Sequence, residues 1–182
     1  QSPKPIQQPQ KMKKLWIKVV LVAVVLIMYG NSVNYEFTID DNLFYLKHSS
    51  VQKGIPGIPE TFAYGSLEKY NGMQGLQPYR PVTLSSFAIQ KQLFDKDPAK
   101  AHLVNVLLYV LLVLVLFNLL LKLLPAAHPV MSGIIVILFA VHPVHTEVVA
   151  SVKSQDELLS VLFAFLALSY SVILFKPYKY SM

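Results

Sequence analysis

Apolar residues in this chain collect into four long blocks that polar stretches separate. The blocks cover residues 15–33, 102–124, 130–146 and 158–175. A helix of about 20 apolar residues is long enough to cross the roughly 30 Å hydrocarbon core of a bilayer. The pattern therefore predicts an all-α integral membrane protein with four transmembrane helices, contained in a membrane module of residues 15–182.

The third block is the least regular of the four. Its uninterrupted apolar run covers only residues 130–141, which is short for a crossing. Pro143 follows closely, and a proline disrupts a regular helix. We expect this helix either to extend toward His145 or to dip only as far as the membrane interface.

A long polar loop, residues 34–100, separates the first two blocks. The loop is rich in glycine and proline, yet it carries more aromatic side chains than a disordered segment would. Residues 82–94 can form an amphipathic helix with Leu84, Phe87 and Ala88 on its apolar face. We expect a compact loop that lies on the membrane surface.

The charges sort between the two sides of the predicted membrane. Every aspartate and glutamate falls on one side, in the long loop or in residues 142–157. The positive-inside rule places the opposite side, with both termini and an expected disordered tail at residues 1–14, in the cytoplasm. No cleavage pattern follows the first block, which favours an uncleaved helix over a signal peptide. The basic side carries these lysines: Lys4, Lys11, Lys13, Lys14, Lys18, Lys122, Lys176 and Lys179.

The bulk composition agrees with a membrane protein and narrows the function classes. The 182 residues are 54% hydrophobic and 14% charged, compared with about 25% charged residues in average soluble chains. The net charge of +6 could suggest nucleic acid binding, but the lysines flank the apolar blocks and form no stripe with aromatic residues. We therefore expect no nucleic acid partner. The sequence contains no cysteine, which excludes disulfides and thiolate chemistry within it.

Two adjacent carboxylates, Asp40 and Asp41, lie just outside the first predicted helix. Like charges at this spacing raise the pKa of one group unless a cation or a polar partner compensates. The pair is therefore a candidate reactive site. The alternative is a solvated loop start or a helix cap, which aspartate favours.

A second candidate group, His142, His145 and Glu147, follows the apolar run of the third block. Ionisable residues at membrane depth are costly and usually face a cavity. The spacing does not match the H-E-x-x-H zinc motif, and Pro143 disrupts the helix that would align the two imidazoles. The alternative is a segment that ends the helix at the interface.

Two further groups lie on the same predicted side of the membrane. Residues 153–157 open the fourth block, where Ser154 and Glu157 match a capping box. Arg80 is the only arginine in the sequence, and a guanidinium near lipid suits bidentate phosphate binding or anchors a headgroup. Carboxylates, imidazoles and this arginine together would suit chemistry on a lipid-linked phosphate.

Several strings in these regions resemble one family when they are taken in order. The strings are Asp-Asp-Asn at 40–42, Tyr-Arg-Pro-Val-Thr at 79–83, His-Leu-Val-Asn-Val-Leu-Leu at 102–108 and Phe-Ala-Val-His-Pro-Val-His-Thr-Glu-Val-Val-Ala at 139–150. They resemble the N-terminal part of the transmembrane and tetratricopeptide-repeat O-mannosyltransferases and their bacterial relatives. These enzymes belong to the GT-C class of membrane glycosyltransferases.

The resemblance implies transfer of a sugar, with mannose expected, from a polyprenyl-phosphate donor in the membrane to a hydroxyl group of a protein acceptor. It implies that Asp41 or Asp40 is the catalytic base of an inverting transfer. Arg80 or Lys153 would stabilise the leaving phosphate. A divalent cation is an additional candidate ligand, although no cofactor is certain. The remaining substrate-binding roles fall to His142, His145, Glu147 and Asp156.

The sequence also departs from the family. Residues 153–156 read Lys-Ser-Gln-Asp where the family often has Gly-Arg-Ala-Asp, and the sequence carries fewer spans than GT-C enzymes have. An alternative function is therefore a non-catalytic accessory subunit that packs against other membrane subunits. A transporter is disfavoured because three of the blocks carry almost no ionisable residues. We expect the chain in a bacterial inner membrane.

Overall fold

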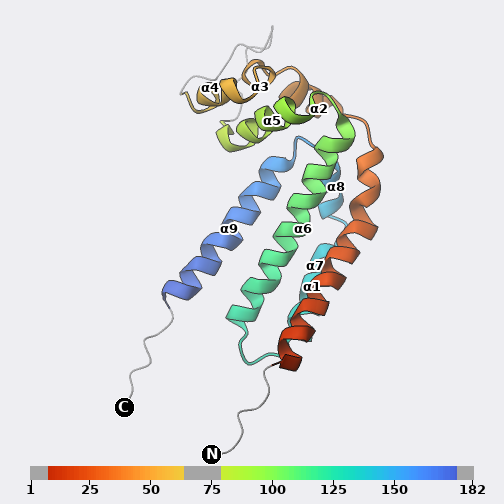
Figure 1. Ribbon diagram of the computed structural model, residues 1–182, viewed down its shortest axis with the longest axis vertical. Helices are drawn as coiled ribbons and strands as arrows, with labels where there is room; N and C mark the ends of the chain where they lie inside the picture. Colours follow the sequence, from red (N-terminus) through yellow and green to blue (C-terminus); the bar gives the residue numbers. More distant parts are fainter. Residues whose placement is uncertain (1–7, 64–78, 176–182) are drawn as a thin grey trace, which may run out of the picture.

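The computed structural model describes residues 8–63 and 79–175, and every regular element among them is a helix. Three helices are long and apolar enough to cross a membrane: α1 (Gln8–Tyr29), α6 (Pro98–Leu123) and α9 (Gln155–Leu174). Figure 1 shows them side by side, with α6 between the other two. The all-α membrane fold expected from the sequence is confirmed.

The core of this bundle forms where α1 and α9 each pack against α6. Buried residues at helical spacing make the contacts, with Leu21 and Val25 from α1, Tyr109 from α6, and Leu158 and Leu162 from α9. Residues three or four positions apart share one face of a helix, so each helix presents one stripe to its neighbour. The remaining faces of α1 and α9 are exposed and apolar, as lipid contact requires.

The third predicted span is two helices and not one. Helix α7 (Pro129–Ala140) ends before the histidines, and the short helix α8 (His145–Ala150) follows after a turn. Pro143 accounts for the break, because it has no N–H to donate to the carbonyl of Phe139. The expected extension of one helix toward His145 is therefore wrong. Both helices pack against α1 and α6 and together run from the α6–α7 turn toward the opposite end of the bundle (Figure 1).

The break leaves a backbone carbonyl that two tyrosines satisfy. The hydroxyl of Tyr29 donates to the carbonyl oxygen of Ala140 at 2.9 Å, and the hydroxyl of Tyr109 donates to the same oxygen at 3.1 Å. The two rings meet edge to face, with centroids 5.2 Å apart. An unsatisfied carbonyl costs several kcal/mol in hydrocarbon, so this pair stabilises the interrupted helix.

The described parts of the long loop fold into a layer of short helices over one end of the bundle, and we call this layer the head. The one long helix of the head is α5 (Pro81–Phe94), which closely matches the amphipathic helix predicted over residues 82–94. Its residues Leu84, Phe87 and Ala88 are buried, as expected. Before α5, the chain forms η1 (Gly30–Asn34), α2 (Ile39–Asp41), η2 (Asn42–Leu46), α3 (Ser49–Gln52), η3 (Ile55–Gly57) and α4 (Ile58–Phe62), and α5 itself covers Pro81–Phe94.

The head has its own small core around Tyr45. The ring of Tyr45 stacks on Phe37 and meets Phe87 edge to face. Its hydroxyl donates to the backbone carbonyl of Asp95 at 3.2 Å. Burial, with the nearby charges of Asp95 and Asp97, raises the pKa of Tyr45 to about 12. The head is therefore a packed layer and not a loose loop.

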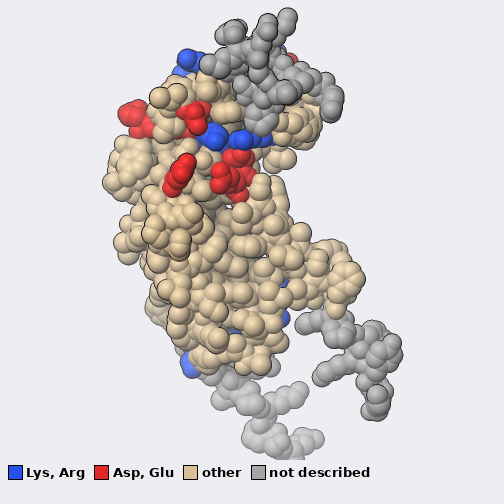
Figure 2. All heavy atoms as spheres, turned by 180° about the vertical axis from the view of Figure 1, so that it is seen from behind, with Lys and Arg blue, Asp and Glu red and all other residues tan. Residues whose placement is uncertain are grey.

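The two ends of the bundle differ in charge. The start of α1, the α6–α7 turn and the end of α9 lie at one end, opposite the head (Figure 1). In Figure 2 the acidic side chains gather in the upper part, where the head meets the bundle. This placement agrees with the predicted sorting of acidic residues. Helix α1 begins at Gln8, so residues 8–14 of the predicted disordered tail are helical, whereas residues 1–7 lie outside the described ranges.

The shared carbonyl of Ala140 predicts a non-additive pair of mutations. Tyr29→Phe or Tyr109→Phe alone leaves one donor, so each should cost less than about 1 kcal/mol of unfolding free energy. The double variant leaves the carbonyl without a donor and should lose about 1 kcal/mol more than the sum of the single losses. Unfolding in mixed detergent micelles measures these differences. Strict additivity would show that the carbonyl has another partner.

Candidate functional site

The connection between α8 and α9, residues 151–154, is fixed from the head by Asp41. The side chain of Asp41 is buried, and its Oδ1 accepts a hydrogen bond from the backbone N–H of Lys153 at 2.6 Å. The hydroxyl of Ser151 donates to the same oxygen at 3.5 Å. The other carboxylate oxygen of Asp41 accepts a hydrogen bond from the backbone N–H of Thr38 at 2.8 Å. This bond completes a capping box at α2. Both carboxylate oxygens of Asp41 are therefore occupied.

The same connection is held from the bundle by Asn105 of α6. The amide nitrogen of Asn105 donates to the carbonyl of Ser151 at 2.7 Å, and its oxygen accepts from the side chain of Gln155 at 2.9 Å. Gln155 in turn accepts a hydrogen bond from Gln90 of α5 at 2.9 Å. This buried amide chain joins the head to the start of α9. This chain of amides was not predicted from the sequence, although an asparagine within an apolar helix signals a buried polar contact.

The first turn of α9 carries Asp156, which binds the only arginine of the chain. The guanidinium of Arg80 lies 2.5 Å from Oδ2 of Asp156, and both side chains are mostly buried. The other carboxylate oxygen, Oδ1, is buried without a hydrogen-bond partner. Arg80 also lies over the ring of Phe44, 5.7 Å from its centroid. The ion pair thus has an uncompensated acceptor and a guanidinium with donors to spare.

This ion pair lies in a cleft of roughly 370 Å³ between α5 and α9. Thr83 and Ser160 add hydroxyl groups to the polar part of its lining. Val82, Leu159 and Phe163 form an apolar part. A cleft with a charged part and an apolar part is suited to a ligand that has a polar headgroup and a hydrocarbon tail.

His145 belongs to a different cleft, whereas His142 is exposed and does not line it. His145 packs against Phe139 and lies 6.2 Å from His142, measured between ring centroids. With Glu157, His145 lines a mostly apolar cleft of about 230 Å³ that α6, α7, α8 and α9 enclose. Asp156 and Glu157 are consecutive on α9 and so face different directions. The two clefts therefore lie on different sides of α9.

The predicted site residues are thus only partly brought together. Arg80 and Asp156 form a pair, and Asp41 lies under the connection that leads to Asp156. Asp40 and Glu147 are exposed. Lys153 contributes its backbone N–H to Asp41, and its side chain does not line the Arg80 cleft.

The predicted capping box at the start of α9 does not form. Ser154 is the residue before the helix, but its side chain caps no backbone N–H. The hydrogen bonds from Asp41 and Asn105 hold this turn instead. Within residues 8–63 and 79–175, no group of three or more histidine, aspartate or glutamate side chains is placed to hold a metal ion.

Comparison with known proteins gives relatives of one kind. Protein O-mannosyl-transferase TMTC4 of Mus musculus is 31% identical over 177 residues, which cover 87% of this chain and 23% of that protein. Protein O-mannosyl-transferase TMTC1 of Mus musculus is 34% identical over 146 residues, covering 79% of this chain and 15% of that protein. Protein O-mannosyl-transferase TMTC3 of Homo sapiens is 28% identical over 155 residues, covering 84% of this chain and 16% of that protein.

The chain thus spans less than a quarter of the length of these relatives. No family model and no solved structure matches it.

The geometry predicts different roles for the two neighbouring aspartates. Asp41→Ala removes the acceptor for the N–H groups of Thr38 and Lys153 and should lower the unfolding free energy by about 2 kcal/mol. Asp40→Ala, the exposed matched control, should change it by less than about 0.5 kcal/mol. Thermal unfolding in detergent measures the stability, and amide hydrogen exchange at Lys153 should accelerate only in Asp41→Ala. Equal effects of the two variants would contradict the assigned hydrogen bonds.

Proposed function

Because the chain is related to the TMTC protein O-mannosyl-transferases over most of its length, we propose that it forms a membrane module of a protein O-mannosyltransferase. In this proposal the module binds a polyprenyl-phosphate sugar, with mannose as the expected sugar, and the acceptor is a hydroxyl group of a protein. The head lies outside the cytoplasm and both termini lie inside, because the described residues at the end of the bundle opposite the head include lysines and no aspartate or glutamate.

The observation that carries the proposal is the Arg80–Asp156 pair in its amphipathic cleft. A guanidinium that is already oriented by a carboxylate can donate its remaining N–H groups to phosphate oxygens. Phe163 and Leu159 offer an apolar surface for the first part of a polyprenyl chain. One ligand of this class therefore matches both parts of the cleft.

The proposed reaction is a displacement with inversion at the anomeric carbon. The acceptor oxygen forms a bond to this carbon while the bond from the carbon to the phosphate oxygen breaks. The acceptor proton passes to a carboxylate, and the lipid phosphate leaves as an anion. Arg80 stabilises the negative charge that grows on the leaving phosphate.

Asp40 is the better candidate for the general base in the conformation observed. Asp41 accepts hydrogen bonds on both carboxylate oxygens, whereas Asp40 is exposed and its carboxylate makes no hydrogen bond with a described residue. Asp41 then acts as a positioning residue, because it fixes the connection that precedes Asp156. Asp40→Asn should therefore abolish transfer without changing stability, and Asp41→Asn should lower both. Retained transfer in both variants would refute the catalytic carboxylate and favour an accessory subunit.

The Arg80 cleft gives a second test of the proposal. Arg80→Gln should lower kcat/KM for sugar transfer by about 10²- to 10³-fold, because a donor to the developing charge is lost. Lys91→Gln is the matched control, since it removes a basic residue of α5 that pairs with Asp95 away from the cleft. Transfer from polyprenyl-phosphate mannose to an acceptor peptide, measured with the full-length protein in membranes, should be unchanged in this control.

A charge swap separates phosphate binding from a purely structural ion pair. Arg80→Asp combined with Asp156→Arg restores an ion pair but moves the guanidinium onto α9. If Arg80 binds phosphate, the double variant should fold and remain inactive. Recovery of transfer in the double variant would show that only the ion pair matters.

A further inference from the structure

The membrane-embedded part of α1 contains a cation that has no partner among the residues that the structure describes. Lys18 is the only charged residue between positions 15 and 33. Among the described residues, its ammonium makes neither an ion pair nor a hydrogen bond. Lys122, by comparison, lies at the same end of the bundle and donates to the carbonyl of Ser169 at 3.4 Å. An unpaired charge at membrane depth is costly, so Lys18 requires an anion or water.

No described carboxylate side chain lies at this end of the bundle. Among the residues that the structure describes, every aspartate and glutamate falls within residues 36–60, 95–97 or 147–157, toward the head. The nearest neighbours of Lys18 in sequence that carry charge are other lysines, Lys13 and Lys14. An anion that pairs with Lys18 therefore has to come from outside the described residues.

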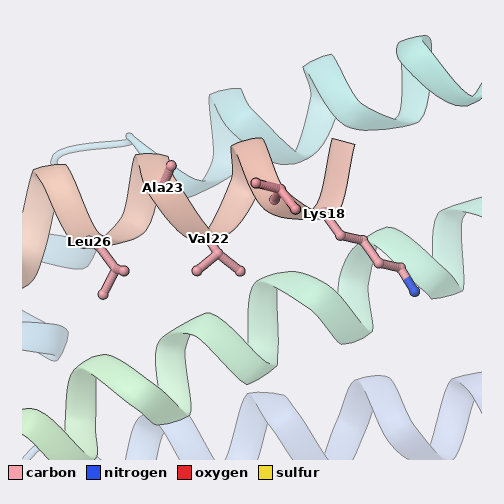
Figure 3. A pocket seen from close by; sticks show the side chains of 5 residues that line it. Lys18, Val22, Ala23 and Leu26 are labelled. Carbon is pink, nitrogen blue, oxygen red and sulfur yellow. The ribbon is translucent and has the colours of Figure 1, made fainter. Parts of the chain in front are cut away.

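Lys18 also stands at one end of an apolar groove. The groove has a volume of roughly 340 Å³ and is lined by Lys18, Val19, Val22, Ala23 and Leu26. Figure 3 shows the stem of Lys18 running outward to its nitrogen, while Val22 and Leu26 point into the space beside the helix. Ala23 supplies a small side chain where its neighbours are larger.

The length of the groove fits one leaflet of a bilayer. From Lys18 to Leu26 the helix rises roughly 12 Å at 1.5 Å per residue, and one leaflet contributes about 15 Å of hydrocarbon. A lipid of the leaflet around the start of α1 can therefore place one chain along Val22 and Leu26. Its headgroup then lies at the level that the Lys18 ammonium reaches.

We propose that this groove is a binding site for an anionic phospholipid, with its phosphate at Lys18 and one acyl chain along Val22 and Leu26. The negative headgroup supplies a counter-ion for Lys18. The acyl chain of the lipid covers the exposed apolar side chains of the groove. The site lies at the opposite end of the bundle from the Arg80 cleft. Lipid binding here is thus independent of the proposed sugar transfer.

Trp16 offers a direct probe of the lipid around α1, because it is the only tryptophan and is exposed two residues from Lys18. The protein is reconstituted in phosphatidylcholine vesicles that contain a minor fraction of brominated phosphatidylglycerol or brominated phosphatidylcholine. Quenching of Trp16 fluorescence gives the relative association of the two lipids. The wild type should prefer the anionic lipid by about fivefold, the factor expected for one lysine at an anionic lipid surface.

Three variants test the site. Lys18→Met keeps the long apolar stem and removes the charge, so the preference should fall close to one. Ala23→Leu keeps the charge and narrows the groove, so the preference should also fall. Lys13→Met is the matched control, because Lys13 is an exposed lysine of the same helix outside the groove, and it should keep most of the preference.

Each other outcome overturns the proposal. Equal quenching of the wild type by both brominated lipids would show that no anionic lipid is selected. Equal losses in Lys13→Met and Lys18→Met would show a diffuse attraction to the basic end of α1. Weak quenching by either lipid in the full-length protein would show that another segment covers this face. None of these outcomes depends on transfer activity, so failure here leaves the proposed function untouched.

Discussion

The connection between α8 and α9 receives hydrogen bonds from both the head and the bundle. Asp41 binds it from the head and Asn105 binds it from α6, and both contacts involve buried side chains. A charge-assisted hydrogen bond in a buried environment is about twice as strong as a neutral one. Because α9 begins directly after this connection, these two contacts set the position of Asp156. The geometry of the Arg80 cleft therefore depends on residues that do not line it.

The membrane imposes a second constraint, which is that every backbone polar group within hydrocarbon needs a partner. Pro143 ends α7 and makes a continuous third span impossible, so the carbonyl of Ala140 takes hydroxyl groups from Tyr29 and Tyr109. The cost of the break is thus offset by side chains of two neighbouring helices. This arrangement also ties α1 and α6 to the end of α7, next to the turn that carries His142 and His145. An interrupted helix is tolerated at membrane depth where neighbouring helices supply donors to the freed carbonyl.

The sequence predicted those features that depend on local pattern. Long apolar runs predicted α1, α6 and α9, and the spacing of Leu84 and Phe87 predicted α5. Features that depend on contacts between distant segments were not predicted. Arg80 and Asp156 were both singled out, but no periodicity indicates that a residue of the head pairs with the first turn of α9. The role of Asp41 was likewise open, because a capping aspartate and a reactive aspartate have the same sequence pattern.

The two clefts lie on different sides of α9, and this separation limits which groups can act together. Asp156 and Ser160 face the Arg80 cleft, whereas Glu157 and Val161 face the cleft that contains His145. A phosphate held by Arg80 cannot at the same time contact the histidines unless α9 moves. Movement of α9 would break the hydrogen bonds that Gln155 makes to Asn105 and Gln90. Because these hydrogen bonds are buried, a rigid α9 with two separate clefts follows from the same contacts that place Asp156 beside Arg80.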